Sequence, residues 1–459
     1  MQLDPKESPQ YAIVAAVQLP SVSDAEFNAS LSELRELAKT LGITVVHTFM
    51  QKRSSFDTTS YLGNGKCEEV KRYIDNDPVM DAWQTDAKLL EYAGKIDFVL
   101  VDHDISPSQA RNLELAVGCE VMDRTMVILE IFHRNARSHA AKAQVEIARL
   151  GYMAPRLREA AKLAGPQGRQ RSGVGGRGAG ESGTELDKRK IRDRIAELKK
   201  DITAMEADRV IQRSRRQERQ GLACVTLVGY TNAGKSTLMR ALTGSEVLVA
   251  NKLFATLDTT VRVLYPESVP RILVSDTVGF IKNLPHGLVA SFKSTLDEAL
   301  DASLLLHVID ASDPGFERQL AVTDEVLADI GAQDLPRLRI FNKIDHVGDD
   351  AAQASCRAAL TEKYPGCVVM SARRPDDVAA LRLAIIAMFQ GELIEAELFL
   401  PWSAQQVRGQ IYTNCAVLAE RSEEDGTYFT VRGEPAAIQA LREQIDPAMK
   451  PVILEDWEK

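Results

Sequence analysis

Residues 225–237, VTLVGYTNAGKST, constrain the fold of this chain more than any other stretch. An apolar run ends at Gly229, and Gly-Lys-Ser follows after four further residues, which is the spacing of a phosphate-binding loop between a strand and a helix. In such a loop, backbone N–H groups and the positive end of the helix surround phosphate oxygens. A glycine turn that matches by accident is much rarer when strand-like and helix-like segments flank the pattern. The predicted loop consists of Gly229, Tyr230, Thr231, Asn232, Ala233, Gly234, Lys235, Ser236 and Thr237.

Two side chains of this loop predict how a ligand would be held. The Lys235 ammonium can reach the β- and γ-phosphates of a nucleotide, and the Ser236 hydroxyl can coordinate Mg²⁺. The loop therefore predicts a nucleoside triphosphate bound together with magnesium.

Length and composition limit which class of protein this chain can belong to. The 459 residues exceed one ordinary domain, and a content of 45% hydrophobic and 26% charged residues is typical of a globular protein in water. The six cysteines are scattered without a C-x-x-C pair, which suits a reducing compartment and argues against a zinc site. The net charge of −9 gives no support for nucleic-acid binding, which would need local basic patches. With no leader-like start and no bilayer-length apolar run, we expect a cytoplasmic protein without membrane insertion. We also expect a monomer.

Residues 1–134 predict an α/β domain. Four apolar segments predict its strands: 11–19, 43–51, 97–102 and 119–123. Between them, Phe27, Leu31 and Leu34 share one face of a predicted helix, and Ser106 with Pro107 begins another. Alternating strands and helices imply a parallel sheet covered by helices. The stretch 76–94 does not fit this alternation and is expected to be an extra excursion.

Several polar loops of this domain contain residues whose presence is not explained by packing of a core. They are 51–53 (QKR), 61–66 (YLGNGK), 103–109 (HDISPSQ) and 123–125 (DRT). Arg53, Lys66 and Arg124 are candidates for contacts with phosphates. Ordinary turn chemistry is the equal alternative, because Asn and Gly favour turns. His103 and His133 are expected to have structural roles.

Residues 135–220 predict a helical hairpin that links the domains. Two apolar series repeat at spacings of four and three, which is typical of paired helices: Ala143, Ile147, Leu150, Ala154 and Leu157, then Ile191, Ile195, Leu198, Ile202 and Met205. Pro155 is expected to kink the first helix. Residues 166–183 are Gly-rich and basic, so they cannot bury a core and are expected to form a mobile tip. The basic residues of the second helix are either a solvated face or an RNA-binding arm.

Residues 221–390 and 391–459 predict two further domains. In the first, strands at 304–310, 337–343 and 367–372 alternate with helices, after an antiparallel pair at 259–266 and 271–276. This pattern predicts a doubly wound α/β domain with its site at the carboxyl ends of the strands. The second has a β-α-β-β-α-β pattern around a turn at Asp425-Gly426, which predicts a small α+β domain with a structural or docking role.

Further motifs follow the phosphate loop in the order of a guanine-nucleotide site. In 276-DTVG-279, Asp276 can hold a water on Mg²⁺ and the Gly279 N–H can contact the γ-phosphate. In 342-NKID-345, Asp345 can accept two hydrogen bonds from the guanine N1 and N2 edge, a pair that adenine lacks. Each motif alone is weak, but all of them in this order select GTP.

The predicted nucleotide contacts of these motifs fall into four groups. The first is Asp276, Thr277, Val278 and Gly279, and the second is Asn342, Lys343, Ile344 and Asp345. The third is Ser371, Ala372 and Arg373, whose backbone N–H groups can meet the guanine O6. The fourth is Phe254, Ala255, Thr256, Leu257 and Asp258, where a threonine can reach Mg²⁺ only when a γ-phosphate is present. The domain is thus predicted to be a P-loop GTPase domain, and the whole chain to be a multidomain α/β protein.

The chain resembles the HflX family of translational GTPases. The shared motifs are GYTNAGKS, FATLDTTVR, DTVGFI, LPHGLVASF and NKID, with QKR, YLGNGK, HDISPSQ, EVMDRT and ILEIF in the first domain. The resemblance covers nearly the whole chain, apart from the 76–94 excursion and Ser54-Ser55-Phe56. It implies a GTPase that binds rRNA of the large ribosomal subunit and splits stalled or idle ribosomes. It also implies Mg²⁺ ligation by Ser236 and Thr256, with Asp276 acting through water.

Three rival functions are distinguishable. A tRNA-modifying GTPase of this kind would carry a carboxyl-terminal cysteine, whereas this chain ends in EDWEK. A membrane-transport GTPase would need spanning helices. An RNA-binding, GTP-gated assembly or regulatory switch with incidental turnover is the alternative that stays open.

The sequence contains no certain catalytic residue. Phe280 stands where some GTPases carry a water-orienting glutamine, and it cannot form the hydrogen bond, so we expect slow hydrolysis that ribosomes stimulate. Lys235 and Asn232 are candidates for stabilising the transition state. Asn232 either coordinates K⁺, as an asparagine does in potassium-activated GTPases, or only braces the loop.

Overall fold

The structure is a computed structural model. It describes residues 9–75, 92, 95–163, 188–205, 223–244, 253–254, 260–268, 270–282, 299–300, 302–390, 394–433 and 435–445. The chain divides into two compact units: residues 1–204, 250–258 and 282–293 in the first, and residues 205–249, 259–281 and 294–459 in the second. The domain boundaries expected at 134, 220 and 390 stay predictions, and each unit is described by itself.

The first unit contains a four-stranded parallel sheet in the order β2-β1-β3-β4. Its strands lie at the predicted places: β1 Gln10–Gln18, β2 Ile43–Lys52, β3 Phe98–Val101 and β4 Glu120–Asp123. Its helices are α1 Asp24–Thr40, α2 Asn64–Ile74, α4 Pro107–Val117 and α5 Arg124–Asn135. Ile13, Ala15 and Val17 of β1 pack with α2 and α4, whereas the alternate residues, also fully buried, face the opposite side. Both faces of the sheet are therefore covered.

Local signals explain where these helices begin. The Ser23 hydroxyl accepts from the Glu26 N–H at the start of α1, and Ser106 with Gln109 forms a capping box at the start of α4. Helix α2 is a departure from the sequence analysis, which placed 61–66 in a loop. Its N-cap is Gly63, so two turn-forming residues, Asn64 and Gly65, occupy its first turn.

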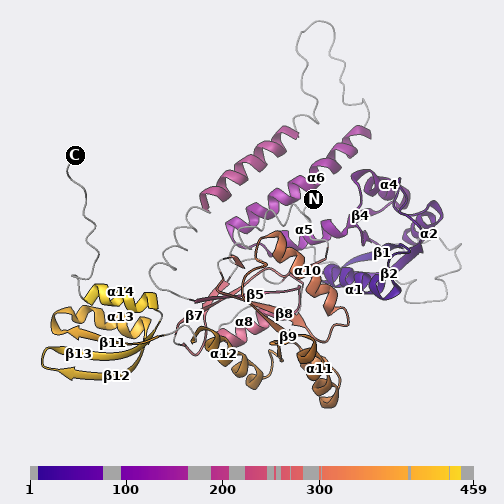
Figure 1. Cartoon of the computed structure of the whole chain (residues 1–459). Helices are drawn as coiled ribbons and strands as arrows, with labels where there is room; N and C mark the ends of the chain where they lie inside the picture. Colours follow the sequence, from indigo (N-terminus) through magenta and orange to yellow (C-terminus); the bar gives the residue numbers. More distant parts are fainter. Residues whose placement is uncertain are drawn as a thin grey trace, which may run out of the picture. The chain divides into compact units, whose positions relative to one another are not determined.

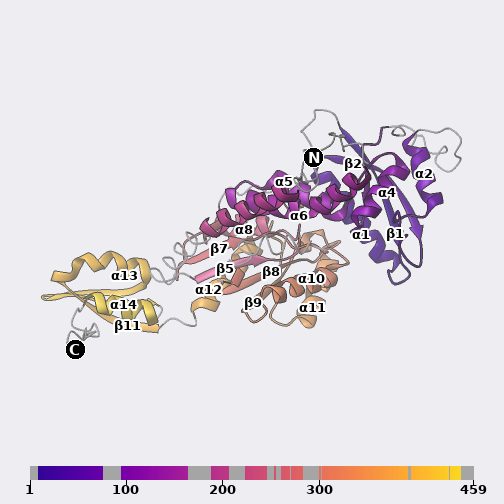
Figure 2. The same cartoon turned by 90° about the horizontal axis from the view of Figure 1, so that it is seen from above.

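The linker contains two helices that lie side by side in both views (Figures 1 and 2). The first, α6, spans His139–Leu163 and begins later than predicted, after a break that follows α5. The second covers residues 188–205. The Arg194 guanidinium joins them by donating to both carboxylate oxygens of Glu146, at 3.0 and 3.2 Å. Helix α6 continues through Pro155, and Leu157 is half-exposed, so the predicted apolar seam does not extend to Leu157.

The second unit contains the doubly wound sheet that the sequence predicts. Its strands run in the order β10-β9-β8-β5-β7-β6, and only β6 is antiparallel. They are β5 Ala223–Val228, β6 Thr260–Val263, β7 Ile272–Asp276, β8 Leu304–Asp310, β9 Arg337–Asn342 and β10 Val368–Val369. The helices are α8 Lys235–Thr243, α10 Phe316–Asp329, α11 Asp350–Lys363 and α12 Pro375–Gln390, with a 3-10 turn η2 at Ile344–His346. Apolar residues of α8 and α12 pack with the central strands.

The same unit ends in a small antiparallel sheet, β11-β13-β12. Its elements are β11 Ile394–Pro401, η3 Trp402–Val407, α13 Arg408–Asn414, β12 Ala416–Glu423, β13 Gly426–Gly433 and α14 Pro435–Ile445. Leu398, Phe429 and Ile438 are central to its core. The predicted last strand, within 451–457, lies outside the described residues, as do the excursion 76–94 apart from Tyr92 and the glycine tip 166–183. Among the helices that the structure describes, none combines the length and the apolar character needed to cross a bilayer.

Candidate active site

The phosphate loop joins the carboxyl end of β5 to α8 through a backbone that only certain residues adopt. Gly234 has φ +98°, and a Cβ there would lie 2.3 Å from the Asn342 side-chain nitrogen. Asn232 is also left-handed, with φ 61°, a region that asparagine tolerates better than most residues. Both positions therefore fix the bend that turns the loop N–H groups toward a ligand.

Lys235 lies buried at the first position of α8. Its ammonium donates to the carbonyl oxygens of Gly229 and Tyr230, at 3.0 and 2.8 Å. Burial lowers the pKa of Lys235 to about 8, an effect that the Asp276 carboxylate opposes and the Lys343 ammonium reinforces. A phosphate placed here would supply the negative charge that this buried ammonium needs.

The segment after β7 is bonded to the phosphate loop through its backbone. The Thr231 N–H donates to the Phe280 carbonyl at 2.7 Å, and the Phe280 N–H donates to the Gly229 carbonyl at 3.1 Å. A Cβ on Gly279 would lie 2.7 Å from the Thr231 Cα and 3.0 Å from the Lys235 Nζ, so only glycine fits. The Phe280 side chain is buried and carries no polar atom, so it cannot orient a water molecule.

Oxygen ligands suitable for Mg²⁺ lie together at the ends of β7 and the phosphate loop. The Ser236 hydroxyl donates to Asp276 at 2.8 Å, and the Asp276 side chain is buried. Hydroxyl and carboxylate oxygens are the donors that Mg²⁺ prefers, so these residues fit the ion. The Thr277 hydroxyl instead donates to the Leu227 carbonyl and holds the strand ends together. Ala255, Thr256, Leu257 and Asp258 lie outside the described residues.

The 342–345 motif connects the phosphate loop with the 371–373 loop. The Asn342 amide donates to the Ala233 carbonyl at 3.0 Å, and its oxygen accepts from the Ala372 N–H at 2.9 Å. Lys343, left-handed at φ 61°, donates to Asp310 at 2.7 Å. The sequence analysis missed Asp310, although it ends β8 at the edge where this fold gathers its site.

Asp345 is the residue expected to select guanine. Burial alone would raise the pKa of its carboxyl, but the Ser371 hydroxyl and a backbone N–H outweigh this effect and lower it. The carboxylate is therefore ionised at neutral pH, as an acceptor for two guanine N–H groups must be.

The expected contact between the 371–373 N–H groups and guanine O6 does not match the bonds in the structure. The Ser371 N–H donates to Asp377 at 2.8 Å, the Ala372 N–H to Asn342, and the Arg373 N–H to the Ser371 hydroxyl at 3.2 Å. Guanine O6 would have to share or replace one of these bonds, so this contact stays a prediction.

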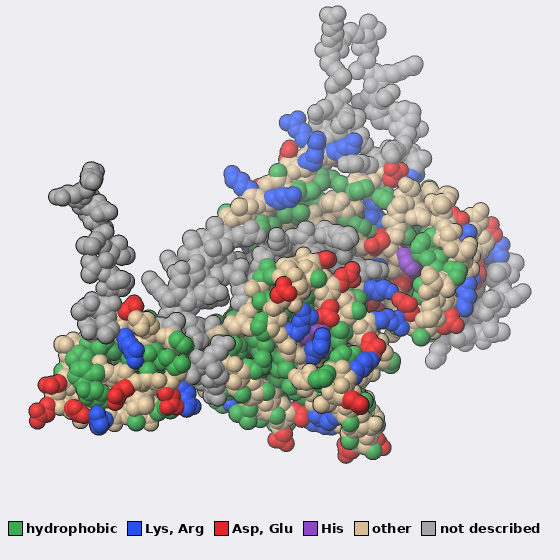
Figure 3. Space-filling view, viewed as in Figure 1, with side chains coloured by type: hydrophobic (Ala, Val, Ile, Leu, Met, Phe, Trp, Pro, Cys, Tyr) green, Lys and Arg blue, Asp and Glu red, His purple; other side chains and the backbone are tan. Residues whose placement is uncertain are grey.

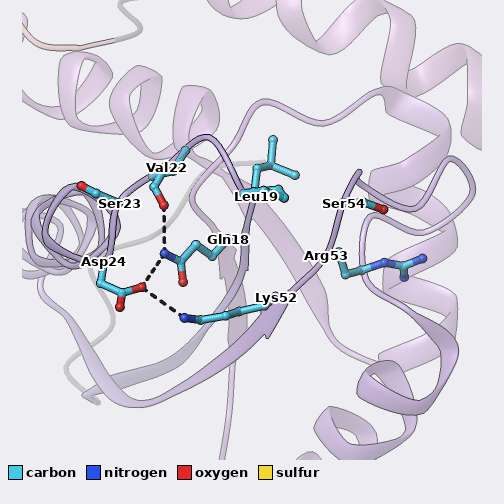
Figure 4. Close-up of a pocket in the computed structure, with 9 residues that line it drawn as sticks. Gln18, Leu19, Val22, Ser23, Asp24, Lys52, Arg53 and Ser54 are labelled. Atoms are coloured by element: carbon cyan, nitrogen blue, oxygen red, sulfur yellow. Dashed lines mark hydrogen bonds and ion pairs between the residues drawn. The ribbon is translucent and has the colours of Figure 1, made fainter.

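The first unit has a pocket of about 560 Å³ at the carboxyl ends of β1 and β2 (Figure 4). Gln18 and Lys52 point toward the Asp24 carboxylate, which accepts from them at 2.7 and 3.1 Å, while Arg53 points away. Arg53 lies 3.6 Å from Asp57, and Lys66 lies 2.6 Å from Glu69. Arg53 and Lys66, the two cations of these loops that are predicted to contact phosphates, thus each lie beside a carboxylate.

The expectation that Arg124 contacts phosphate is wrong. Its side chain is 1% exposed and donates to Asp102 at 2.9 Å and to Glu33. A guanidinium held by two carboxylates inside the domain cannot reach an external phosphate. The Nδ1 of His103 lies 2.9 Å from the Tyr61 hydroxyl, and the structural role expected of His103 stays a prediction.

The helix at 188–205 carries the basic residues predicted for the hairpin. Figure 3 shows Lys and Arg side chains gathered over it. Its exposed cations are Arg189, Lys190, Arg192, Arg194, Lys199 and Lys200. Arg194 lies 2.9 Å from Glu197, so acidic residues on the same helix neutralise part of this charge.

Together, the phosphate loop, the Ser236–Asp276 pair and the 342–345 motif define a P-loop GTPase. Three family models match the chain: "GTP-binding GTPase N-terminal" over residues 28–133, "GTP-binding GTPase Middle Region" over 135–216 and "50S ribosome-binding GTPase" over 224–343. The chain is 50% identical to GTPase HflX of Gluconacetobacter diazotrophicus over 453 residues, which cover 95% of this chain and 97% of that protein. It is also 35% identical to GTPase HflX of Escherichia coli, over 92% of this chain and 93% of the relative.

The chain belongs to the HflX family of GTPases, and it binds and hydrolyses GTP. Among solved structures, a GTP-binding protein of Sulfolobus solfataricus in complex with GDP is similar, with 23% identity over 82% of this chain and 99% of that one, and a TM-score of 0.42.

Proposed function

We propose that this GTPase binds the large ribosomal subunit and uses its GTP cycle to split or rescue stalled or idle ribosomes. The observation that supports the proposal is the buried Phe280 beside the described residues of a guanine-nucleotide site. A site without its own water-orienting side chain at this position needs a partner to reach a useful rate. The matched model named for 50S binding and the exposed cations of helix 188–205 support the large subunit as that partner.

The site's own residues suggest how the reaction proceeds. Mg²⁺, held by Ser236, by Thr256 and through water by Asp276, would neutralise charge on the β- and γ-phosphates. Lys235 binds the same phosphates, and the N–H groups of the loop orient them. Asp345 holds the guanine edge, so the reacting phosphate is positioned from both ends of the nucleotide.

The position of Asn232 carries a narrower proposal about K⁺. Asn232 is exposed and left-handed in the phosphate loop, so its amide oxygen is available to a cation beside the phosphates. A K⁺ beside the phosphates would stabilise the negative charge of the transition state. An arginine supplied in trans does this in other GTPases, where it raises the rate of hydrolysis by up to about 10⁵. Bracing of the loop is the alternative role.

Single-turnover GTP hydrolysis with and without large ribosomal subunits tests the main proposal. We expect slow turnover alone and stimulation by subunits, together with cosedimentation that is stronger with a non-hydrolysable GTP analogue than with GDP. Equal turnover with and without subunits would favour the GTP-gated regulatory switch instead. Repeating the measurement in KCl and NaCl at equal ionic strength tests the ion, and an Asn232→Ala variant that keeps a K⁺ preference would rule out its role.

A further inference from the structure

Two charged residues beside the 371–373 loop belong to none of the nucleotide motifs. Asp377 lies in the first turn of α12, and Arg357 lies in the middle of α11. The Arg357 guanidinium pairs with the Asp377 carboxylate at 3.3 Å and also donates to the carbonyl of Val369, the last residue of β10. The pair therefore joins two helices to the strand that precedes the loop.

The Asp377 carboxylate also fixes the backbone of Ser371. It accepts from the Ser371 N–H at 2.8 Å, through the same oxygen that faces Arg357. Ser371 is 1% exposed, and a buried N–H without a partner costs free energy. The loop therefore takes the position in which this bond forms, and that position is set by a carboxylate of the following helix.

Ser371 in turn contacts the residue expected to bind the guanine edge. Its hydroxyl donates to the Asp345 carboxylate and accepts from the Arg373 N–H at 3.2 Å. A hydroxyl has one proton, so the bond from the backbone leaves that proton for the carboxylate and fixes its direction. Asp345 is thus held by the protein itself, and the ordering of its side chain belongs to folding rather than to nucleotide binding.

A second carboxylate in the same turn separates the effect of charge from the effect of this bond. Asp376 also lies in the first turn of α12, where the end of the helix favours a negative charge. Its side chain is exposed, and of the two carboxylates only Asp377 is bonded to the loop within the described stretch 302–390. An effect of charge at the helix end would be common to both residues, whereas an effect of the Ser371 bond belongs to Asp377 alone.

We propose that Asp377 and Arg357 are positioning residues for guanine recognition, because they place Ser371 and, through its hydroxyl, the Asp345 carboxylate. This carboxylate has to meet the N1–H and N2–H₂ donors of the base together, so its orientation matters as well as its charge. Loss of the Asp377 bond releases Ser371, lets Asp345 turn and weakens the bond to N2. The inference rests on the base-binding role proposed for Asp345, and its test uses no ribosomes, so it stands or falls apart from the proposed action on ribosomes.

A comparison of GDP with IDP isolates the bond to N2. The base of IDP lacks the 2-amino group, and both nucleotides share the sugar and the phosphates, so damage elsewhere in the site weakens both and cancels in the ratio of their affinities. Competition against a fluorescent GDP analogue gives both affinities for the full-length protein at fixed Mg²⁺ and pH. We expect the unsubstituted protein to bind IDP about tenfold or more weakly than GDP, the effect of one hydrogen bond to a charged group.

The variants should change this ratio in a defined order. Asp377→Ala should lower it by about threefold or more, whereas the matched control Asp376→Ala should leave it unchanged. Asp377→Asn keeps an acceptor for the Ser371 N–H and should retain most of the ratio. Arg357→Gln removes the cation that holds the Asp377 carboxylate and should give an intermediate ratio.

Ser371→Ala tests the route, because it removes the hydroxyl and leaves the N–H in place. It should lower the ratio, and adding Asp377→Ala should lower it no further, since both changes interrupt one connection. A ratio in Asp377→Ala equal to that in Asp376→Ala would overturn the proposal, as would effects of Ser371→Ala and Asp377→Ala that multiply. If Asp377→Ala does not fold, an unchanged ratio in Arg357→Gln overturns it equally.

Asp345→Ala tests the premise in the same assay. A ratio that Asp345→Ala leaves unchanged shows that Asp345 does not bind N2, and the proposal then fails together with its premise. A ratio that Asp345→Ala lowers and Asp377→Ala does not overturns the positioning role alone.

Discussion

The pKa of Lys235 predicts that pH acts in opposite directions on the stability of the protein and on its affinity for nucleotide. Burial lowers this pKa to about 8 from its ordinary value of 10.5. Between these values the unfolded chain binds more protons than the folded one, so the stability of the protein without nucleotide rises with pH. The two pKa values differ by about 2.5 units, and each unit corresponds to about 1.36 kcal/mol. The free energy of unfolding should therefore rise by an amount on the order of 3 kcal/mol.

Nucleotide binding should show the reverse dependence. A bound phosphate stabilises the ammonium, so the complex keeps a proton that the free protein loses above about pH 8. Binding therefore takes up about half a proton near pH 8, and affinity falls by up to about tenfold for each further pH unit.

Calorimetry of GDP binding in two buffers of different ionisation enthalpy measures this proton uptake directly. Lys235→Arg is the control, because its guanidinium stays charged and should bind GDP without taking up a proton. Ionisation of the guanine base is common to both proteins and cancels in the comparison. Thermal unfolding of the protein without nucleotide provides the second arm, in which Lys235→Met should lose the rise in stability between about pH 8 and 10. Two results would refute the argument. One is that Lys235→Arg takes up as many protons on binding GDP as the unsubstituted protein. The other is that the stability of Lys235→Met rises with pH as steeply as that of the unsubstituted protein.

Three further predictions concern the base site and the hairpin. Asp345→Asn should weaken GTP binding and permit xanthosine nucleotides, and an unchanged preference between GTP and XTP in competition would contradict the role of Asp345. Asn342→Ala removes the partner of the Ala233 carbonyl and of the Ala372 N–H, so we expect the free energy of unfolding to fall by about 2–4 kcal/mol. Urea denaturation measures this loss, which should be much smaller for Asp345→Asn. Deletion of 173–183 should leave GTP binding intact and reduce stimulation by ribosomes, and equal stimulation with and without the tip would exclude its role.

The sequence predicts best those features that depend on residues close together in the chain. The phosphate loop, the capping box at Ser106 and the strand that ends at Asp276 each follow from a few neighbouring residues. The order of the motifs along the chain then places them at one edge of the sheet, because parallel strands in this fold end on the same side.

The features that the sequence did not predict depend on partners far away in the chain. Arg124 looks like a surface cation in its own loop, but its carboxylate partners, Asp102 and Glu33, lie 22 and 91 residues earlier and hold it inside the domain. The N–H groups of Ser371 and Ala372 look available for guanine until Asp377 and Asn342 are placed beside them. Helix α2 was missed for another reason. Its first turn contains the turn-forming residues Asn64 and Gly65, which favoured a loop. The helical spacing of the buried residues Cys67, Val70 and Tyr73 was the signal for a helix.

These internal bonds change how the energetics of the GTP site should be understood. The Lys235 ammonium donates to loop carbonyls, the Ser236 hydroxyl donates to Asp276, and the Ala372 N–H donates to Asn342. A nucleotide that takes over any of these groups exchanges one hydrogen bond for another, so the net gain from each is small. The buried Lys235 ammonium, whose charge a phosphate would balance, is expected to contribute more to the affinity than these exchanged bonds, for GDP and GTP alike. Discrimination between GTP and GDP is then expected to depend on the groups predicted to meet the γ-phosphate, which include the Gly279 N–H and Thr256.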